Sequence, residues 1–516
     1  MSQPTVAALD TQVITAGPLA LPPQRRLMVA LMMALALLLQ VATSGWGPVG
    51  NGADGMNAAI ARELALGMRP AEISKQWHHP VSATAVQWLT AQSFHLFNVN
   101  EFAARLPFAA ANLLVVLLVF LIGDRTGGFW RGLSAGFIAA TMSGTVLEGR
   151  DGGGAALTAL WLTLSFYAAV RMLEQNCDRQ WQVFYWVALG GLLLLRQPGA
   201  AVLSLSGVWV AFACFRVARI RLQRAHWITG NLLFLAAVMF FYAEQFRIPA
   251  GINLEHSGRY LWTLFPWAIV MLPPFLCRMR RVIRLREITP AEAVLGCVFL
   301  FATVWLLVSS GTEKWPASAA CLGPVFALFA SLIWERTGSH IRMLGVGCLI
   351  ATAVAAMTLC ERVAGPEWLH LLQPIWWMSS GVIIVFGISA MIALYHRHSR
   401  AALLTIAAST IPLSFNLLDA RARYDWLHTM KDLGKKTEIG YMPGSKVFID
   451  SEPDAVSSFL FYAPHGLGIY PLRSASSVRP SSMDFLLVSR VHTLNLPAAE
   501  KIGTNSTHSL LRVSKP

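Results

Sequence analysis

The stretch Gly52–Arg105 reads GADGMNAAIARELALGMRPAEISKQWHHPVSATAVQWLTAQSFHLFNVNEFAAR, and it decides how the rest of the chain is interpreted. It separates two long apolar runs, Leu27–Val41 and Leu106–Gly123. Most connections between secondary-structure elements are only a handful of residues long. This one is far longer and holds acids, bases, tryptophans and paired histidines. We therefore expect any chemistry of this protein to start in this loop.

The first part of the loop has helical periodicity. Apolar residues recur every four positions, while Arg62 and Glu63 occupy another face. The apolar residues are Met56, Ile60, Leu64 and Met68. This pattern predicts an amphipathic helix that lies along a membrane surface.

Composition indicates an integral membrane protein. Of the 516 residues, 55% are hydrophobic and only 13% are charged, with a mean hydropathy of +0.52; soluble proteins carry roughly 25% charged residues. Several of the 18 tryptophans fall near the ends of apolar runs, as in interfacial aromatic belts. The net charge of +14 comes largely from bases in short loops, without a nucleic-acid-binding motif. The position of these bases therefore indicates that the positive charge orients the protein in the membrane, and it does not indicate a nucleic-acid partner.

Neither the cysteines nor the N-terminal residues indicate a site of their own. Six of the seven cysteines lie in or at the ends of apolar runs, and none has zinc-ligand spacing, which is typical of small buried residues. The first apolar run follows Arg25 and Arg26 and lacks a clear cleavage site. We expect residues 1–26 to be a flexible cytoplasmic tail before an uncleaved first helix.

Thirteen apolar stretches approach the roughly 17–25 residues that span a membrane. They fall at about 27–45, 106–123, 132–148, 154–173, 182–196, 198–215, 226–243, 260–277, 291–310, 316–334, 343–361, 372–395 and 401–417. Alternate loops are rich in arginine, from Arg125 and Arg131 through to Arg397 and Arg400. By the positive-inside rule, this alternation predicts a cytoplasmic N-terminus and an external C-terminus.

Composition changes near Leu418. Short strand-like runs (VFID, FLLVSRV and LLRVS) are separated by proline, glycine and serine. The pattern predicts a small α/β or mostly β periplasmic domain over residues 418–516. The predicted transmembrane domain is then 27–417, with a first periplasmic loop at 46–105.

Asp54 stands at the start of the predicted first-loop helix. An aspartate in this position is commonly an N-cap, but a carboxylate at the membrane surface could also act as a general base or orient a phosphate acceptor. Glu63, nine residues on, is either a substrate ligand or a solvated helix residue. Both alternatives stay open for each residue.

Other candidates lie in the same loop. His78 and His79, next to Trp77, could contact a phosphate, or they could belong to an ordinary polar loop; no third metal ligand stands at a useful spacing. Glu101 and Arg105 are four residues apart, and we expect them to form a helix ion pair, although both could bind substrate.

The later outer loops add further charges. Arg150 and Asp151 precede three glycines, where the backbone could approach a ligand closely. Charged residues at the mouth of a spanning helix are costly unless they are paired or functional. Arg196, in LLLLRQPG, and Lys314, in SSGTEKWP, are similar. Basic groups that converge from several loops would suit a lipid-linked phosphate.

In this order, the segments resemble the bacterial aminoarabinose transferase and protein O-mannosyltransferase families of GT-C membrane glycosyltransferases. The resemblance covers about residues 27–335 in scattered pieces. Its segments are ADGMNAAIAREL, LTAQSFHLFNVNEFAARLPFAAANLLVV, GGLLLLRQPG, LWTLFPWAIVMLPP and SSGTEKWPASAACLGPVFAL. It implies an α-helical polytopic GT-C fold of about 13 transmembrane helices, with periplasmic surface helices and a small periplasmic C-terminal domain.

The resemblance also implies a reaction. The sugar donor would be a polyprenyl (undecaprenyl) phosphate glycoside, the acceptor a periplasmic lipid, glycan or protein, and the transfer inverting. Asp54 would be the first catalytic candidate, with Asp151 the second. Arg196 and Lys314 would stabilise the phosphate charge. No cofactor is required, and a divalent metal is neither required nor excluded.

The chain also departs from the family pattern. Gly55 stands where the family usually has a glutamate, and His78, His79 and Pro80 stand where it has Lys-Pro-Pro. Asp151 follows Arg150 directly, and Arg196 precedes Gln197–Pro198. The alternative function is therefore a catalytically inactive protein that binds polyprenyl-linked glycans in envelope assembly. A transporter is less favoured, because charges gather at helix ends and no internal repeat is visible.

Overall fold

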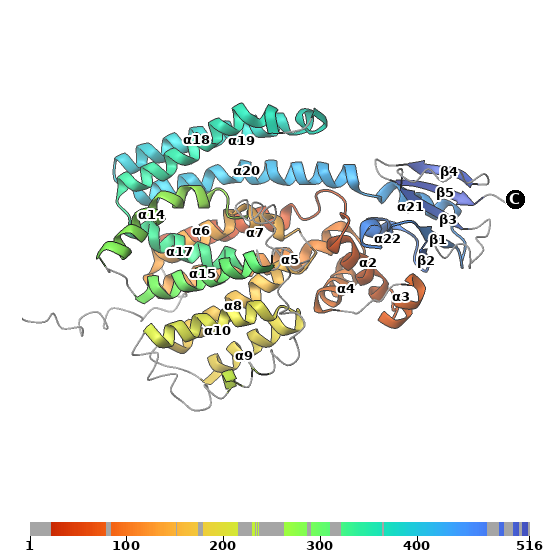
Figure 1. Cartoon of the computed structure of the whole chain (residues 1–516), viewed down its shortest axis with the longest axis horizontal. Coiled ribbons are helices and arrows are strands. Elements are labelled where there is room, and N and C mark those ends of the chain that lie inside the picture. Colours follow the sequence, from red (N-terminus) through yellow and green to blue (C-terminus); the bar gives the residue numbers. More distant parts are fainter. Residues whose placement is uncertain are drawn as a thin grey trace, which may run out of the picture. The chain divides into compact units, whose positions relative to one another are not determined.

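The structure is a computed structural model of the chain (Figure 1). It describes residues 22–78, 84–150, 152–173, 179–214, 230–232, 234, 236, 263–285, 290–309, 321–363, 366–451, 453–471, 484–489, 499–504 and 508–513. The candidates His79, Asp151 and Lys314 lie outside these residues.

The chain divides into two compact units. A helical unit contains Met1–Leu39, Asn112–Val146 and Thr158–Ser414. An α/β unit combines Gln40–Ala111, Leu147–Leu157 and Phe415–Pro516. The α/β unit therefore joins most of the first loop, the segment Leu147–Leu157 (the second outer loop of the predicted topology) and the C-terminal segment. The domain boundary at 417/418 stays a prediction.

Long apolar helices dominate the helical unit, and α5 and α20 contribute residues to both units. The helices are α1 (Pro23–Leu37), followed by a π-helical turn (Leu38–Ala42), α5 (Glu101–Gly127), α6 (Phe129–Thr141), α7 (Ser143–Glu148), α8 (Ala155–Leu173), α9 (Arg179–Leu194), α10 (Pro198–Cys214), α14 (Trp267–Leu285), α15 (Pro290–Ser309), α17 (Leu322–Arg336), α18 (Ser339–Val363), α19 (Pro366–Tyr395) and α20 (Ser399–His428). Apolar segments form helices in a membrane because lipid offers no hydrogen-bond partners, and a helix pairs its own backbone N–H and C=O groups.

Among the described residues, six helices are long and apolar enough to cross a membrane. They are Pro23–Ala42, Glu101–Gly127, Ala155–Met172, Ser339–Met357, Trp376–Tyr395 and Ser399–Arg423. A helix overlaps each other predicted span, and the few described residues of 226–243 are helical too, although most of that span lies outside the described residues. The protein is thus a multi-span helical membrane protein, and the full number of spans stays a prediction.

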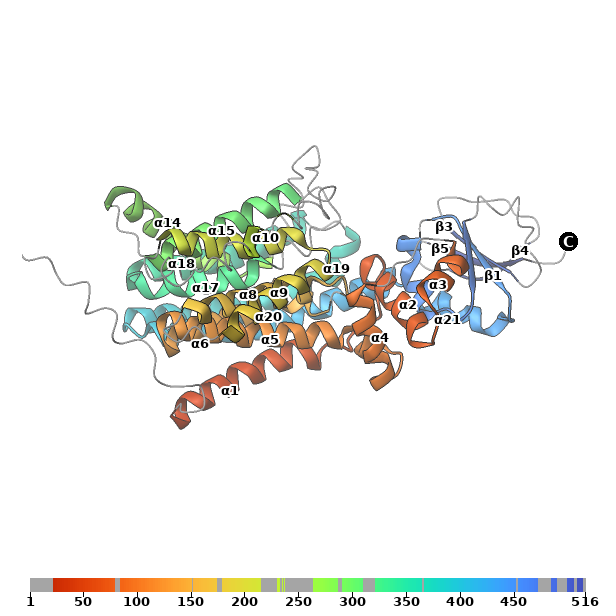
Figure 2. The same ribbon diagram turned by 90° about the horizontal axis from the view of Figure 1, so that it is seen from below.

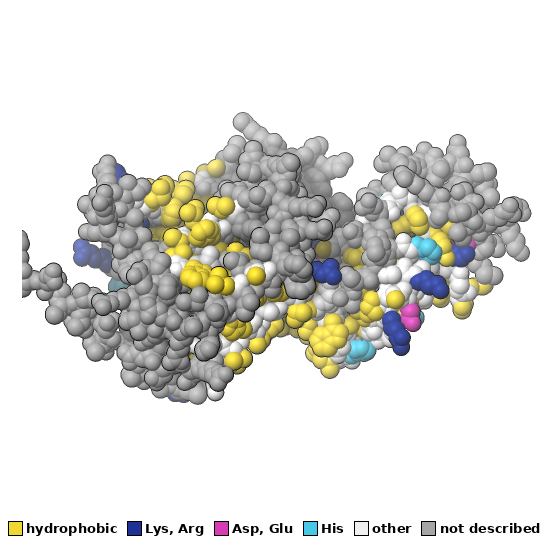
Figure 3. Space-filling model, turned by 60° about the horizontal axis from the view of Figure 1, so that its bottom comes forward, with side chains coloured by type: hydrophobic (Ala, Val, Ile, Leu, Met, Phe, Trp, Pro, Cys, Tyr) yellow, Lys and Arg dark blue, Asp and Glu magenta, His cyan; other side chains and the backbone are white. Residues whose placement is uncertain are grey.

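Helix packing in this unit depends on small residues. Figure 2 shows α1 beside α6, and α18 pairs with α19. A Cβ atom built on Gly132 of α6 would lie only 2.6 Å from the Phe120 carbonyl oxygen of α5. Such close backbone approach is typical of helix pairs in membranes. On the face shown in Figure 3, many of the visible side chains over the helical unit are hydrophobic, and a few lysine or arginine side chains appear at its left end.

The C-terminal segment forms a mixed five-stranded sheet of order β2-β1-β3-β5-β4. Strands β2, β1 and β3 are parallel, and β5 and β4 continue the sheet in antiparallel register. The strands are β1 (Lys446–Ile449), β2 (Gly468–Pro471), β3 (Phe485–Ser489), β4 (Ala499–Thr504) and β5 (His508–Val513). The three strand-like runs of the sequence overlap β1, β3 and β5, so the expectation of a small C-terminal α/β sheet is confirmed.

The first loop folds into three helices, α2 (Ala53–Ala65), α3 (Pro70–Trp77) and α4 (Ala85–Phe97). The periodicity correctly predicted α2. Its apolar face does not lie on a membrane, however, because Met56 and Ile60 are buried in one cluster with Phe459, Phe485 and Leu487 of the C-terminal segment. The periodicity predicted which face of α2 is apolar, but it did not predict that the C-terminal segment packs against that face.

We expect the substitution Gly132→Ala to lower the free energy of unfolding in detergent by about 1–3 kcal/mol, because the new methyl group overpacks the α5–α6 contact. The measurement is thermal unfolding of the purified protein. Gly347→Ala in α18 is the matched control, since no atom lies within 4 Å of its added Cβ and alanine favours helix. Equal melting temperatures for both variants would contradict the close packing.

Candidate functional site

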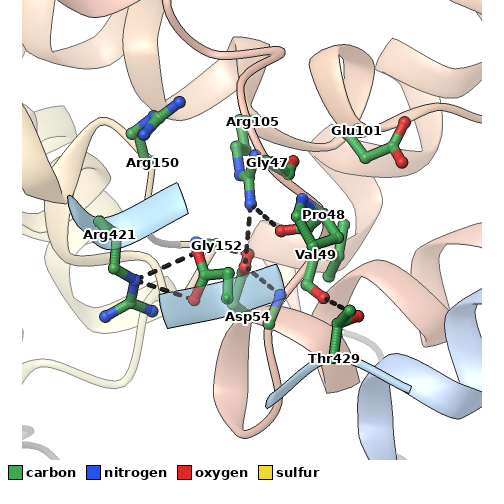
Figure 4. Close-up of polar contacts among 12 residues, drawn as sticks. Gly47, Pro48, Val49, Asp54, Glu101, Arg105, Arg150, Gly152, Arg421 and Thr429 are labelled. Carbon is green, nitrogen blue, oxygen red and sulfur yellow. Dashed lines mark hydrogen bonds and ion pairs between the residues drawn. The ribbon is translucent and has the colours of Figure 1, made fainter. Parts of the chain in front are cut away.

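Arg105, in the second turn of α5, holds the segment that leads into α2. Its guanidinium donates hydrogen bonds to the carbonyl oxygens of Trp46 (3.1 Å), Gly47 (3.0 Å) and Pro48 (2.7 Å), as drawn in part in Figure 4. Its side chain is only 2% exposed. These carbonyls stand outside regular secondary structure, and burying them without a donor would be costly. One arginine therefore fixes the backbone of this segment.

Arg150 reinforces the same segment from the second outer loop. Its guanidinium donates to the carbonyl oxygens of Trp46 (2.7 Å), Thr43 and, in α20, Leu418 (3.2 Å). Burial, together with the charge of Arg105, lowers the pKa of the Arg150 guanidinium to about 10. The side chain is still protonated at neutral pH, and its Nη atoms are engaged by the protein.

Asp54 lies at the centre of this arrangement (Figure 4). One carboxylate oxygen accepts a hydrogen bond from the Gly152 amide (3.0 Å) and the other from the Gly50 amide (3.4 Å). The latter oxygen also lies 3.9 Å from the Arg105 guanidinium. The N-cap of α2 is Gly52, so Asp54 is an acid of the first turn. The N-cap alternative is therefore wrong.

The glycine run of the second outer loop has a steric role. A Cβ atom on Gly152 would lie 2.5 Å from the Asp54 carboxylate, so only glycine allows this approach. The close approach expected from the sequence occurs, but its target is Asp54. The neighbouring Asp151 lies outside the described residues.

Asp425, near the end of α20, also belongs to this cluster. It is buried and pairs with Arg421 (3.1 Å). Burial raises the pKa of the Asp425 carboxyl, and the charges of Arg421 and Arg105 oppose that rise. Neither residue of the pair was among the candidates predicted from the sequence. The available signal was their four-residue spacing just past the last apolar run.

Glu101 does not form the predicted helix pair with Arg105. It accepts hydrogen bonds from Lys431 Nζ (2.6 Å) and from the Tyr462 hydroxyl (3.1 Å), both in the C-terminal segment. Arg105 is instead committed to Asp54 and the backbone carbonyls. A four-residue spacing predicts only local pairs, so it could not predict partners more than 300 residues away.

Glu63 is not a solvated helix residue, since its side chain is only 1% exposed. It forms an ion pair with Arg62, and its second oxygen lies 2.5 Å from His465 Nδ1. Arg62 also donates to the backbone carbonyl of Phe461 (2.7 Å). These contacts attach α2 to the turn after α22 (Ser457–Tyr462).

The structure also describes the candidates His78 and Arg196. The His78 ring contacts the Tyr470 ring in a tilted orientation, with 4.0 Å between ring centroids, and its Nδ1 lies 3.2 Å from the Ile469 carbonyl oxygen. Arg196 follows α9 in the helical unit with a left-handed backbone (φ 56°). The described residues contain no group of three acids, histidines or cysteines able to hold a metal ion.

Comparison with known proteins agrees with the resemblance stated from the sequence. Residues 78–242 match the family model described as dolichyl-phosphate-mannose-protein mannosyltransferase. The fold is similar to the crystal structure of ArnT from Cupriavidus metallidurans in the apo state, with a TM-score of 0.73 and 14% identity over 96% of this chain and 100% of that one. No curated protein sequence matches the chain.

A second structure of ArnT from Cupriavidus metallidurans, bound to undecaprenyl phosphate, is also similar. Its TM-score is 0.66, with 14% identity over 95% of this chain and 99% of that one. At this identity the two likenesses establish the fold. The chain thus resembles the aminoarabinose transferase and mannosyltransferase families of GT-C enzymes in architecture, and it matches the family model over about a third of its length.

We expect Arg105→Lys to destabilise the α/β unit by about 3 kcal/mol or more, because an ammonium cannot serve the same spread of carbonyls and leaves buried acceptors unpaired. Hydrogen exchange at the Gly50 and Gly152 amides should quicken, because Asp54 loses its guanidinium neighbour. The measurement is hydrogen–deuterium exchange with thermal unfolding. Arg423→Lys, at a half-exposed position, is the control. Identical behaviour of the two variants would refute the anchoring role of Arg105.

Proposed function

We propose that this protein is a GT-C membrane glycosyltransferase that moves a sugar from a polyprenyl phosphate carrier to an acceptor hydroxyl on a lipid, glycan or protein. The proposal places it in a bacterial inner membrane with thirteen spans, a cytoplasmic N-terminus and a periplasmic C-terminus. The ArnT-like fold and the match to a mannosyltransferase family support it. The observation that carries it is the held carboxylate of Asp54.

Asp54 suits a general base because its carboxylate is held from three sides and keeps unused acceptor capacity. Each of its oxygens accepts one backbone hydrogen bond, and a carboxylate oxygen has two lone-pair sites. In the proposed reaction the acceptor hydroxyl oxygen forms a bond to the anomeric carbon while its proton passes to Asp54. The bond from that carbon to the phosphate oxygen breaks, and polyprenyl phosphate leaves with inversion.

The two buried arginines are better suited to positioning than to phosphate binding. The Nη donors of Arg105 and Arg150 are engaged by backbone carbonyls in a buried setting. We therefore assign the stabilisation of the leaving phosphate to Arg196 and Lys314, and a second carboxylate role to Asp151. Glu63 and His78 then serve in packing the α/β unit.

The alternative is a protein that binds a polyprenyl-linked glycan without catalysis. The position of His78 favours it, because the family pattern has a cation there, whereas this ring contacts the Tyr470 ring and a carbonyl oxygen. Such a protein would still bind the donor. Transfer activity separates the two functions.

We expect Asp54→Asn to reduce transfer by about 100-fold or more, the scale of lost general-base catalysis. The assay follows radiolabelled sugar from a panel of undecaprenyl phosphate monosaccharides into envelope acceptors, using protein purified in detergent. Asp419→Asn is the control, because that carboxylate is exposed and pairs only with Arg423 among the contacts described.

Three outcomes decide between the functions. Loss of transfer with an unchanged melting temperature supports the general-base role of Asp54. Unchanged transfer by Asp54→Asn would refute that role and move the search to Asp151. A wild-type protein that binds undecaprenyl phosphate but transfers no sugar would overturn the enzymatic function in favour of glycan binding.

A further inference from the structure

A cavity lies in the α/β unit, formed by residues other than those that hold Asp54. Its volume is about 410 Å³, within the range of about 300–1,000 Å³ typical of small-molecule sites. Four segments line it: the end of α2, the residues before α5, the helix α21 (Lys431–Gly440) and the turn after α22. The exposed residues Val99, Lys435 and His465 mark its opening to solvent.

The charges that line this cavity balance. Glu101 and Lys431 form an ion pair at 2.6 Å in the wall, and Lys435 and Glu438 extend from α21. Arg62 adds little free positive charge because Glu63 and two backbone carbonyls engage its guanidinium. Phosphate sites instead gather an excess of arginine and lysine. The cavity therefore favours a neutral ligand that both donates and accepts hydrogen bonds.

The same wall presents an aromatic side chain in a fixed orientation. The Tyr462 hydroxyl accepts a hydrogen bond from the Val49 amide (2.8 Å) and donates to Glu101 (3.1 Å). Burial raises the pKa of this hydroxyl, so it remains a donor at neutral pH. The Tyr462 ring lies 5.2 Å from Lys431 Nζ, and Leu66 and Pro464 add apolar surface.

A sugar ring matches this combination, because its hydroxyl groups donate and accept while its C–H faces pack on aromatic and aliphatic side chains. We propose that the cavity is a saccharide-binding site that docks the glycan part of the acceptor. The docking role rests on the proposed transferase function, whereas the binding itself does not. The acceptor class would then be a neutral glycan or the glycan headgroup of a lipid.

The test is saturation-transfer-difference NMR on the full-length protein in detergent, with titration to obtain affinities. The probes are methyl glycosides of glucose, galactose, mannose and N-acetylglucosamine, with inorganic phosphate as the charged comparison. We expect at least one glycoside to bind, and Lys435→Ala and Glu438→Gln each to weaken it by about 10-fold, the scale of a lost hydrogen bond to a charged group. Lys436→Ala, beside Lys435 but outside the lining, should bind as wild type does.

The outcomes separate this inference from the transferase function. A wild-type protein that transfers sugar but binds no glycoside overturns the inference alone. Glycoside binding that survives both pocket substitutions also overturns it, as does phosphate binding that competes with the glycosides. A protein that binds glycosides through this cavity but transfers nothing supports the site and refutes the transferase. In an active protein, Lys435→Ala should raise the acceptor KM and leave kcat unchanged.

Discussion

The α/β unit depends on buried guanidinium groups that replace missing backbone hydrogen bonds. The chain leaves the π-helical turn at Ala42 and reaches α2 without regular structure, so its carbonyl oxygens need donors. Arg105 and Arg150 supply them from two other segments. Once that backbone is fixed, Gly50 presents its amide to Asp54, and Gly152 presents another from the opposite loop. The position of the carboxylate thus follows from the two arginines.

The unit also separates two kinds of polar chemistry. Around Asp54 the polar groups are buried, and hydrogen bonds to the backbone hold them, as expected where a side chain must keep one orientation. In the cavity lined by Glu101 the charges are of both signs, and some of them reach solvent. The first arrangement suits a reacting group, and the second suits recognition of a hydroxyl-rich ligand. Both use residues of the first loop together with residues of the C-terminal segment.

Much of this architecture was predictable from local sequence. Hydropathy and loop charges indicated a multi-span helical protein, the four-residue repeat of Met56 and Ile60 indicated α2, and the strand-like run FLLVSRV indicated a strand. The errors share one cause, because local patterns do not specify distant partners. Glu101 bonds to Lys431 rather than Arg105, Glu63 is buried beside His465, and α2 packs against the C-terminal core. The Asp425–Arg421 pair differs from these cases, because its four-residue spacing just past the last apolar run is a local signal.

The long-range hydrogen bonds of the first loop can form only after the C-terminal segment has been synthesised. The Asn51 side chain accepts from the Ser458 amide, 407 positions later, and the Gly52 carbonyl accepts from the Ser457 hydroxyl. The Val49 carbonyl likewise accepts from the hydroxyl of Thr429. Although Asp54 leaves the ribosome early, the surroundings that hold it are complete only after the last quarter of the chain has been made and folded. A partly synthesised chain in the membrane therefore carries an unfinished site.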